Sequence, residues 1–451
     1  MTSDMIIGQL DADVAVSPFA RLLSISNDDL SPKFIHRFNI HGEDEHKRSK
    51  EQNECNRVVR GLKNTNGNIC YFNSIIQMLS SSEHFISYLQ NLKKLSKQNS
   101  PLTDFSENLY ELINYVNGSS GGASTGSYSK INSLSTTVLM EIFPKSYNVF
   151  QQQDAQEFLM LIMEKLDQYS LENPLIGWSM TSLKCCECNT VKPIQNQIFG
   201  TLALSTLFGC SSLEQMLDQY ISRSAIEGVE CYNCTLQQTK NNLQSDLLCY
   251  KQALEYVRNR HQDISESEHL SEQAKMVSKD LNYFSKLSPD DDNFEIKFKR
   301  KNFDFHDSCG SDGAILHRKF FKKEFISRPP LVLVLHIHRR TATAKIRKKV
   351  GFPVLLNLST YIVNSGHHLF WISNGEISSG EYPRSSPVNY TLRSVVEHQG
   401  SNNCGHYLTY RKFGDFKSEK WVCTSDEFIK VVDWEIVAKA EAYLLLYERI
   451  C

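Results

Sequence analysis

Cys70 lies where the polar run NTNGNI gives way to the apolar run CYFNSIIQML. The spacing of the apolar residues predicts a helix that begins at this cysteine. The positive end of a helix dipole favours the thiolate and therefore nucleophilicity. The short polar residues before Cys70 could bring backbone N–H groups and an asparagine amide to the same point, as an oxyanion hole. Cys70 is thus a candidate nucleophile, although a lone cysteine is more often an inert buried thiol.

A second run near the C-terminus, GHYLTYRK, supplies a candidate base. His406 follows a glycine within an alternating strand pattern, which would hold the imidazole rigidly at a sheet edge. It could accept the thiol proton of Cys70 and later donate it to a leaving amine. The next strand-like run, WVCTSDEF, offers Ser425 and Asp426, and either side chain could orient the imidazole. A lone histidine is more often structural, so the hypothesis that His406 is a catalytic base depends on its pairing with Cys70.

Composition places few limits on partners. The chain has 451 residues, 41% hydrophobic and 22% charged, with a net charge of −2, so it can bury a large core and has no electrostatic footprint of a nucleic-acid binder. Thirteen cysteines are too sparse and odd in number for a disulfide-stapled scaffold. We therefore expect reduced thiols in an intracellular protein, cytoplasmic or nuclear, without a signal peptide or transmembrane segment. We also expect a monomer.

Local patterns divide the chain into regions. Residues 1–57 mix charges and turn formers and predict a flexible leader before a catalytic region at 58–451. Helical spacing extends from Cys70 and recurs in LTDFSENLYELINYV and DAQEFLMLIMEKLDQYS, where Asp154 and Glu157 suit capping. The run GSSGGASTGS predicts a flexible loop. Residues 241–315 are highly charged and partly helical, which indicates an insertion, and strand-like runs after it predict a largely antiparallel sheet.

The ordered motifs resemble those of the ubiquitin-specific proteases, a family of papain-like cysteine peptidases. GLKNTNGNICYFNSIIQ is similar to the family's cysteine box, and QQQDAQEFL to the glutamine-rich helix that follows it. PPLVLVLHIHR resembles the central strand, GSNNCGHYLTYRK and KWVCTSDEF the histidine box, and AEAYLLLYER the closing strand. Five ordered blocks covering roughly residues 58–450 are far more specific than any one motif.

The resemblance implies an α+β fold with a helical thumb at about residues 58–175 and an antiparallel palm with β fingers at about 176–451. It implies Cys70 on the thumb, His406 on the palm, and hydrolysis of peptide or isopeptide bonds at the C-terminal glycine of ubiquitin. Ubiquitin and ubiquitinated proteins would then be the partners, with no nucleic acid.

The resemblance also implies one structural zinc ion in the fingers. Two Cys-x-x-Cys pairs are present, Cys185 with Cys188 and Cys231 with Cys234. Four thiolates in two such knuckles make a tetrahedral zinc site on chemical grounds as well. Cys186 is an adjacent competitor for Cys185, but its spacing to Cys188 is poorer.

Two positions depart from the family pattern. Asn64, expected to bind the oxyanion, lies six positions before Cys70 rather than five, and Thr65 holds the expected position. Asn68 and backbone N–H groups are alternative donors. Ser425 stands where most relatives have Asp, which resembles a branch of the family with serine as the third residue, and Asp426 follows it.

Two other hypotheses remain open at this stage. A weak or inactive ubiquitin-binding scaffold is favoured by the two departures near Cys70 and at Ser425. A zinc-knuckle adaptor would act through the charged insertion at residues 241–315.

Overall fold

The structure is a computed structural model, and it describes most of residues 51–450. The gaps are residues 53, 56–57, 65–66, 100–103, 119–126, 144–150, 170, 193–194, 207–208, 261–263, 289–296, 299–314, 341–344, 363–386, 402–404 and 414–418. The predicted leader therefore lies outside the described residues except for helical residues 51–52 and 54–55 near its end. Of the predicted loop at residues 118–127, only the two end residues are among the described residues. Thr65 also lies outside the described residues.

Helices form the first part of the described chain, where the sequence predicts them. The first of the group begins at Cys70, as predicted, and all ten of its residues are buried. The predicted cap at Asp154 is also confirmed, because its side chain accepts hydrogen bonds from the backbone N–H groups of Gln156 and Glu157. The helices are α3 (Cys70–Leu79), α4 (Glu83–Asn99), α5 (Asp104–Val116), α6 (Ser127–Ile142) and α7 (Ala155–Leu166).

An eight-stranded sheet forms the palm. Its strand order is β11-β10-β9-β8-β12-β6-β3, with β7 paired to β8. Every pairing is antiparallel except that of β3 with β6, so the predicted largely antiparallel sheet is confirmed. The strands are β3 (Leu202–Ser205), β6 (Val332–His338), β7 (Leu355–Asn357), β8 (Asn389–Gly400), β9 (Gly405–Lys412), β10 (Trp421–Ser425), β11 (Phe428–Val432) and β12 (Ala442–Arg449).

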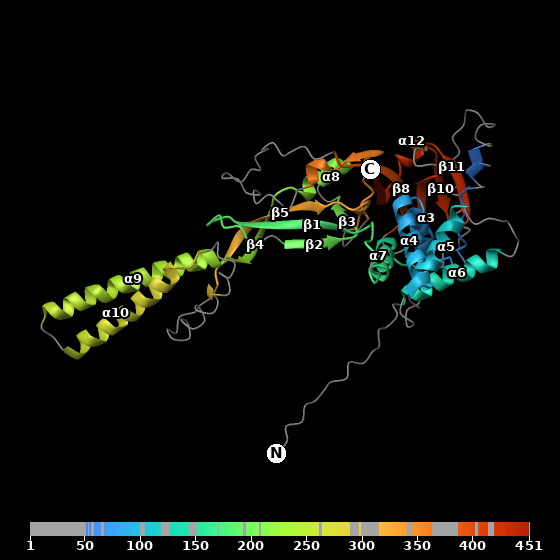
Figure 1. The fold of residues 1–451 in the computed structure, drawn as a ribbon. Helices are drawn as coiled ribbons and strands as arrows, with labels where there is room; N and C mark the ends of the chain where they lie inside the picture. The colour runs from blue at the N-terminus through green and yellow to red at the C-terminus, as the bar shows by residue number, and fades with distance from the viewer. Residues whose placement is uncertain are drawn as a thin grey trace, which may run out of the picture.

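A second sheet, the fingers, has four antiparallel strands in the order β2-β1-β5-β4. Figure 1 shows it extending from the palm toward a long helical hairpin, with the thumb helices at the opposite end of the molecule. Its strands are β1 (Gly177–Cys185), β2 (Gln195–Phe199), β4 (Ser224–Glu230) and β5 (His317–Arg328). Three further short elements are α8 (Leu213–Tyr220), η3 (Ser359–Tyr361) and α12 (Trp434–Val437).

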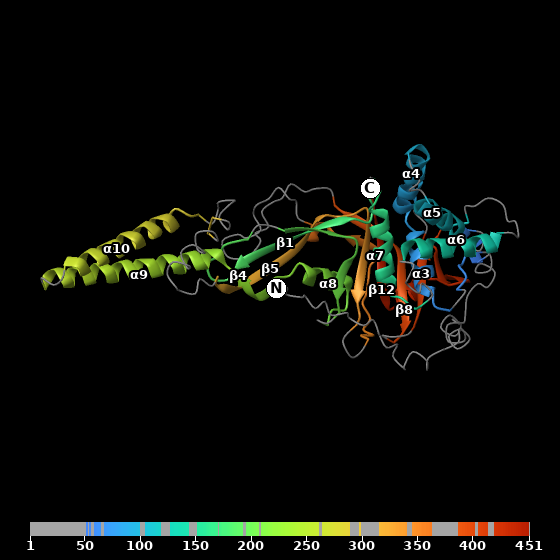
Figure 2. The ribbon, with the colours of Figure 1, turned by 90° about the horizontal axis from the view of Figure 1, so that it is seen from below.

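The helical hairpin consists of α9 (Tyr232–Asn259) and α10 (Ile264–Ser285) and projects away from both sheets (Figure 2). The helical part of the predicted insertion therefore begins at Tyr232 rather than at residue 241. A small cluster of buried apolar side chains joins the base of the hairpin: Tyr232, Leu236, Leu243, Phe284 and Phe298.

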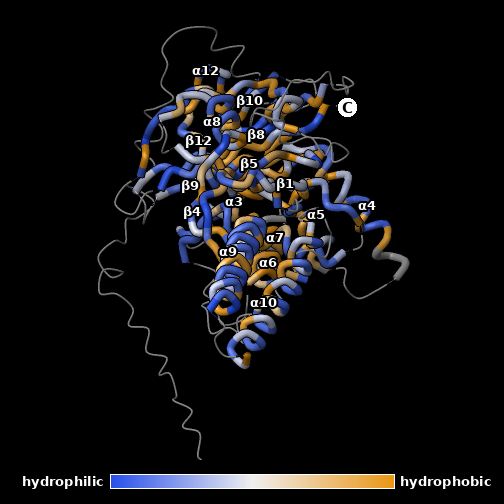
Figure 3. Tube along the Cα trace, turned by 90° about the vertical axis from the view of Figure 1, so that its left-hand side faces the viewer, coloured by the Kyte–Doolittle hydropathy of each residue, from blue (hydrophilic) through white to orange (hydrophobic). Residues whose placement is uncertain are grey.

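Two hydrophobic cores lie on opposite faces of the palm sheet. One packs α3, α5 and α7 against β6, β8, β9 and β12. The other lies beneath α8 and α12. Figure 3 shows hydrophobic residues concentrated at the sheets, whereas α9 and α10 carry mostly hydrophilic residues. Among the described residues, no helix combines the length and apolarity needed to cross a bilayer.

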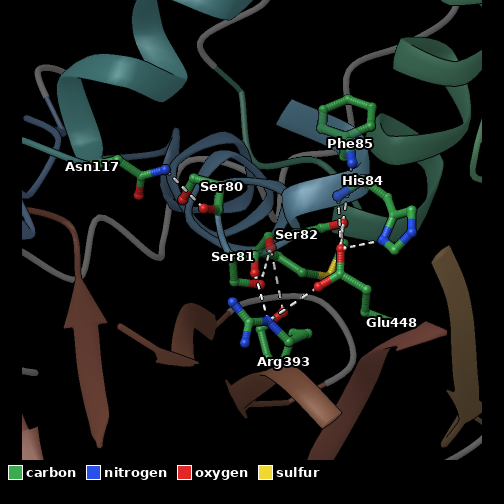
Figure 4. A network of polar contacts seen from close by, with 10 residues as sticks. Ser80, Ser81, Ser82, His84, Phe85, Asn117, Arg393 and Glu448 are labelled. Atoms are coloured by element: carbon green, nitrogen blue, oxygen red, sulfur yellow. Dashed lines mark hydrogen bonds and ion pairs between the residues drawn. The ribbon is translucent and has the colours of Figure 1, made fainter. Parts of the chain in front are cut away.

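A buried ionic network joins thumb to palm at the turn between α3 and α4 (Figure 4). Glu448 on β12 is fully buried and accepts hydrogen bonds from the Ser82 hydroxyl at 2.7 Å and the His84 backbone N–H at 2.8 Å. The Nε atom of Arg393 on β8 lies 3.3 Å from its other carboxylate oxygen. Burial alone would raise the pKa of Glu448, but the bonds from His84 and Ser82 and the charge of Arg393 lower that pKa overall.

Replacing Glu448 by Gln should destabilise the fold strongly, because it leaves the buried Arg393 without its counter-charge. We expect a loss of about 3 kcal/mol in the free energy of unfolding by urea. Because the pKa of Glu448 is lowered on folding, its contribution is present above its unfolded pKa of about 4.3 and is lost as pH falls through the folded value. Glu172→Gln is the matched control, since Glu172 pairs with Arg328 at the exposed surface and should change stability by less than about 1 kcal/mol. Equal effects of the two substitutions would show that the network does not stabilise the fold.

Candidate active site

Helix α3 is fixed directly on the strand that carries His406. The Thr409 hydroxyl on β9 donates to the Ser74 carbonyl at 2.9 Å, and the Ser394 hydroxyl on β8 donates to the Met78 carbonyl at 3.4 Å. The apolar residues of α3 fill the core between these strands and α7. The N-terminus of the helix, with Cys70, is therefore held beside the start of β9.

Cys70 is 2% exposed. The backbone of Tyr407, the residue after His406, lowers the pKa of its thiol. The pKa of Cys70 is raised to about 12, chiefly by burial and also by the charge of Asp426, against the opposing effect of the backbone donors. The expectation that the helix start favours the thiolate is therefore wrong for this resting state, because desolvation outweighs the helix terminus.

A cleft with a volume of about 250 Å³ opens at Cys70 between the thumb and the palm. Asn68 lines it on one side and Gly405 on the other. Two acids at the start of α7, Asp154 and Glu157, also line it. Asp154 is held by the Tyr443 hydroxyl at 2.5 Å and lies 3.7 Å from the Arg340 guanidinium. The cleft thus combines the candidate nucleophile with anchored negative charge.

His406 lies near the start of β9, next to the end of β10. Its Nε2 atom lies 2.7 Å from the Ser425 hydroxyl and 3.8 Å from the Asp426 carboxylate. The structure therefore brings both alternative third residues to the same ring nitrogen, with serine in direct contact. Burial lowers the pKa of His406, and the negative charge of Asp426 opposes that shift.

Asp426 is held firmly by two amides from the thumb. Asn64 donates to its Oδ2 atom at 3.0 Å, and Asn73 donates to its Oδ1 atom at 2.7 Å. Its backbone has a φ of 52°, in the left-handed region, at the turn between β10 and β11. Its carbonyl also accepts from the backbone N–H of Leu62 at 3.0 Å. The carboxylate is therefore fixed between the helix of Cys70 and the imidazole of His406.

The structure gives Asn64 a different contact from the oxyanion donor that the resemblance implied. Its amide nitrogen donates to Asp426, and its amide oxygen accepts from the backbone N–H of Ile69 at 3.1 Å. Asn68 is instead the asparagine that lines the cleft beside Cys70.

The sequence reasoning missed Asn73. It is 2% exposed and lies one helical turn after Cys70, so the two side chains share a face of α3. Its signal in the sequence is a polar residue within a largely apolar helix, but the partner of that residue lies 353 positions away.

The four predicted metal ligands do converge. The sulfur atoms of Cys185, Cys188, Cys231 and Cys234 all lie within 4.8 Å of one another. The Cys188–Cys231 separation is 3.5 Å and the Cys185–Cys234 separation is 3.8 Å. Tetrahedral zinc with Zn–S bonds of about 2.3 Å places its sulfurs roughly 3.8 Å apart, so the donor set fits the ion. The competitor Cys186 lies outside this group.

A buried cysteine at a helix start, with a histidine on the adjoining strand, defines a papain-like thiol hydrolase. The sequence profile of the family ubiquitin carboxyl-terminal hydrolase (UCH) matches residues 60–447, so the chain belongs to that family. The predicted family, the papain-like α+β fold and the class of ubiquitin-specific cysteine hydrolase are thereby confirmed.

Curated relatives match over most of the chain. Ubiquitin carboxyl-terminal hydrolase 27 of Arabidopsis thaliana is 25% identical, with 89% of this chain and 88% of the relative covered. Ubiquitin carboxyl-terminal hydrolase 30 of Xenopus tropicalis is 22% identical, with 87% and 81% covered. Among solved structures, the SAGA Ubp8/Sgf11/Sus1/Sgf73 DUB module bound to ubiquitin aldehyde gives a TM-score of 0.56 at 18% identity, with 94% of this chain and 75% of that chain covered.

Cys70 should react slowly with iodoacetamide in the free protein. A pKa of about 12 leaves little thiolate at pH 7.5, and burial restricts access, so its alkylation rate should rise with pH up to at least pH 9. Cys249 on α9 is exposed and serves as an internal reference. Peptide mass spectrometry of a pH series would measure both rates. Faster labelling of Cys70 than of Cys249 at pH 7.5 would show that the resting thiol is already activated.

Proposed function

We propose that this chain is a deubiquitinating cysteine protease whose nucleophile is Cys70 and whose general base is His406. The observation that carries the proposal is that Cys70 lines a cleft together with Gly405 and Tyr407, the two neighbours of His406, while His406 contacts the Ser425–Asp426 pair, in a chain of the ubiquitin carboxyl-terminal hydrolase family. The scissile bond joins the C-terminal glycine of ubiquitin to an amine of a substrate protein or of another ubiquitin.

The reaction begins from a neutral thiol. With Nε2 of His406 bonded to Ser425, Nδ1 is the ring atom left to take the proton from Cys70. The sulfur attacks the glycine carbonyl, and Asn68 with nearby backbone N–H groups stabilises the oxyanion. The C–N bond then breaks as His406 protonates the leaving amine. Water, deprotonated by His406, hydrolyses the thioester and restores the thiol.

Ser425 and Asp426 contribute in different ways. The Ser425 hydroxyl fixes the orientation of the ring through a short hydrogen bond, but it carries no charge. The Asp426 carboxylate lies slightly farther away and stabilises the imidazolium that forms when Cys70 loses its proton. Asn64 and Asn73 are positioning residues, because they hold that carboxylate through both of its oxygens.

The cleft would receive the extended C-terminal tail of ubiquitin between thumb and palm, while the fingers would contact its globular body. The acids Asp154 and Glu157 at the cleft suit a tail that carries basic side chains. We further propose an intracellular monomer. The absence of disulfides among the ten described cysteines agrees with a reducing compartment.

A structural zinc ion in the fingers completes the proposal. Cys185, Cys188, Cys231 and Cys234 would hold it, and the ion would stabilise the junction between β1 and α9 without taking part in the chemistry.

A ubiquitin with an electrophilic C-terminal warhead tests the proposed activity. The parent protein should form a covalent adduct visible by mass, Cys70→Ala should form none, and His406→Ala should react about 100-fold to 10,000-fold more slowly. Asp426→Asn should slow labelling and move the acid limb of its pH profile to lower pH, because Asp426 raises the pKa of His406. Asn73→Ala should shift the limb in the same direction, whereas Ser425→Ala should slow labelling with a smaller shift.

The same experiment addresses the alternative of a ubiquitin-binding scaffold. A folded parent protein that binds ubiquitin but forms no adduct would support the scaffold and refute the enzyme. An unchanged pH profile in both Asp426→Asn and Asn73→Ala would show that the Asp426 carboxylate does not stabilise the protonated imidazole of His406.

Purified protein should contain zinc at about one ion per chain. Cys231→Ser should lose the metal and lower the unfolding temperature, since it removes one of four ligands. Cys186→Ser is the matched control and should retain the metal, because Cys186 lies outside the cluster. Elemental analysis and thermal unfolding would measure both effects. Equal metal loss in the two variants would contradict the proposed ligand set.

A further inference from the structure

A second cavity, of about 210 Å³, lies between the turn after α3 and strands β8 and β9. It shares no lining residue with the active-site cleft. Its polar lining includes Ser80, Ser81, Glu83, Asn117, Arg393 and Arg411. We call it the arginine cavity.

Arg411 is a buried cation without a facing carboxylate among the described residues. It is 1% exposed. Its Nη1 atom donates to the Ser80 hydroxyl and to the Asn117 amide oxygen at 2.9 Å, and its Nη2 atom donates to the Val116 carbonyl at 3.1 Å. These acceptors are all neutral, and the Nε atom has no hydrogen-bond partner. A buried charge with an unused donor is costly unless an anion or water meets it.

A β-bulge brings a second arginine to the same cavity. In the pairing of β12 with β8, Leu446 lies opposite Ser394 and Tyr447 lies opposite Leu392, so Arg393 is the extra residue. Such a bulge re-aims a side chain across the sheet. Arg393 donates to the Ser81 carbonyl at 2.8 Å beneath the turn drawn in Figure 4.

The acids near the cavity compensate only part of this charge. Glu448 is also bonded to Ser82 and His84 while it faces Arg393. Glu83 lies on the exposed rim. The pKa of Arg411 is lowered to about 9, chiefly by burial and also by the positive charge of Arg393, against the opposing effect of Cys55. Arg393, Arg411 and the buried Lys412 all line the cavity, whereas Glu83 is the one acid in its lining, so positive charge exceeds negative charge there.

We propose that the arginine cavity binds a small tetrahedral oxyanion such as inorganic phosphate. Arg411 and Arg393 both line it and supply two positive charges. Because both cations are buried, an anion carried on a protein or membrane surface would not reach them, so the ligand is a free ion. Its binding ties the turn after α3 to β8 and β9, which are the strands that hold α3 in place.

Equilibrium dialysis of the full chain with radiolabelled inorganic phosphate tests the site. We expect saturable binding of about one phosphate per chain, competition by sulfate, and no competition by chloride at the same ionic strength. Asn117→Asp should weaken binding at least about tenfold, because its carboxylate would face Arg411 in place of the amide oxygen and supply the missing charge internally. Phosphate should also raise the unfolding temperature of the parent protein more than that of Asn117→Asp.

A rim variant keeps the test decisive if Asn117→Asp folds poorly. Glu83→Gln removes the carboxylate that lines the cavity and should tighten phosphate binding about threefold. Glu164→Gln on α7 is the matched control, an exposed acid remote from the cavity lining, and should leave binding unchanged.

Three outcomes would overturn the proposal. The first is a rise in unfolding temperature without saturable phosphate binding, which is the general effect of an excluded salt. The second is equal phosphate binding by Asn117→Asp and the parent protein. The third is equal phosphate binding by Glu83→Gln and Glu164→Gln. In each case water, rather than an oxyanion, would occupy the arginine cavity.

Discussion

The packing of α3 between the thumb helices and the palm sheet is the constraint on which the rest of the structure depends. All ten residues of this helix are buried, and its carbonyls accept hydrogen bonds from β8 and β9. One rigid contact therefore fixes Cys70, Asn73 and the turn after α3 against the strand that carries His406. Close-packed interiors transmit displacement, so the position of the proposed nucleophile relative to the proposed base is set by the packing of the core.

The burial that fixes the positions of Cys70 and His406 also disfavours the charged form of both side chains in the free protein. Desolvation raises the pKa of Cys70 and lowers that of His406, so both groups are held neutral. The charge of Asp426 favours the protonated imidazole but disfavours the thiolate. In the proposed mechanism, proton transfer from sulfur to imidazole is therefore best coupled to attack on the substrate, because the sulfur then carries little negative charge.

Sequence reasoning succeeded where the signal was local. The start of α3 and the cap of α7 at Asp154 follow from neighbouring residues, and the cysteine pairs carry their own spacing. It missed α6, whose Ser- and Thr-rich sequence has little apolar periodicity, and it placed the second cysteine pair before the helical insertion rather than at its first turn. The contact of Asn64 with Asp426 and the burial of Cys70 depend on segments hundreds of residues apart, so no local pattern contains them.

The attachment of the helical hairpin has a mechanical consequence. Cys231 is the N-cap of α9 and Cys234 lies in its first turn, so two of the four clustered sulfurs belong to the base of this helix. At a rise of 1.5 Å per residue, α9 is a lever about 42 Å long. A rotation of about 5° at the cysteine cluster would move the far end of this lever by roughly 4 Å. The arrangement of the four sulfurs at the base of α9 thus sets the direction of the whole hairpin.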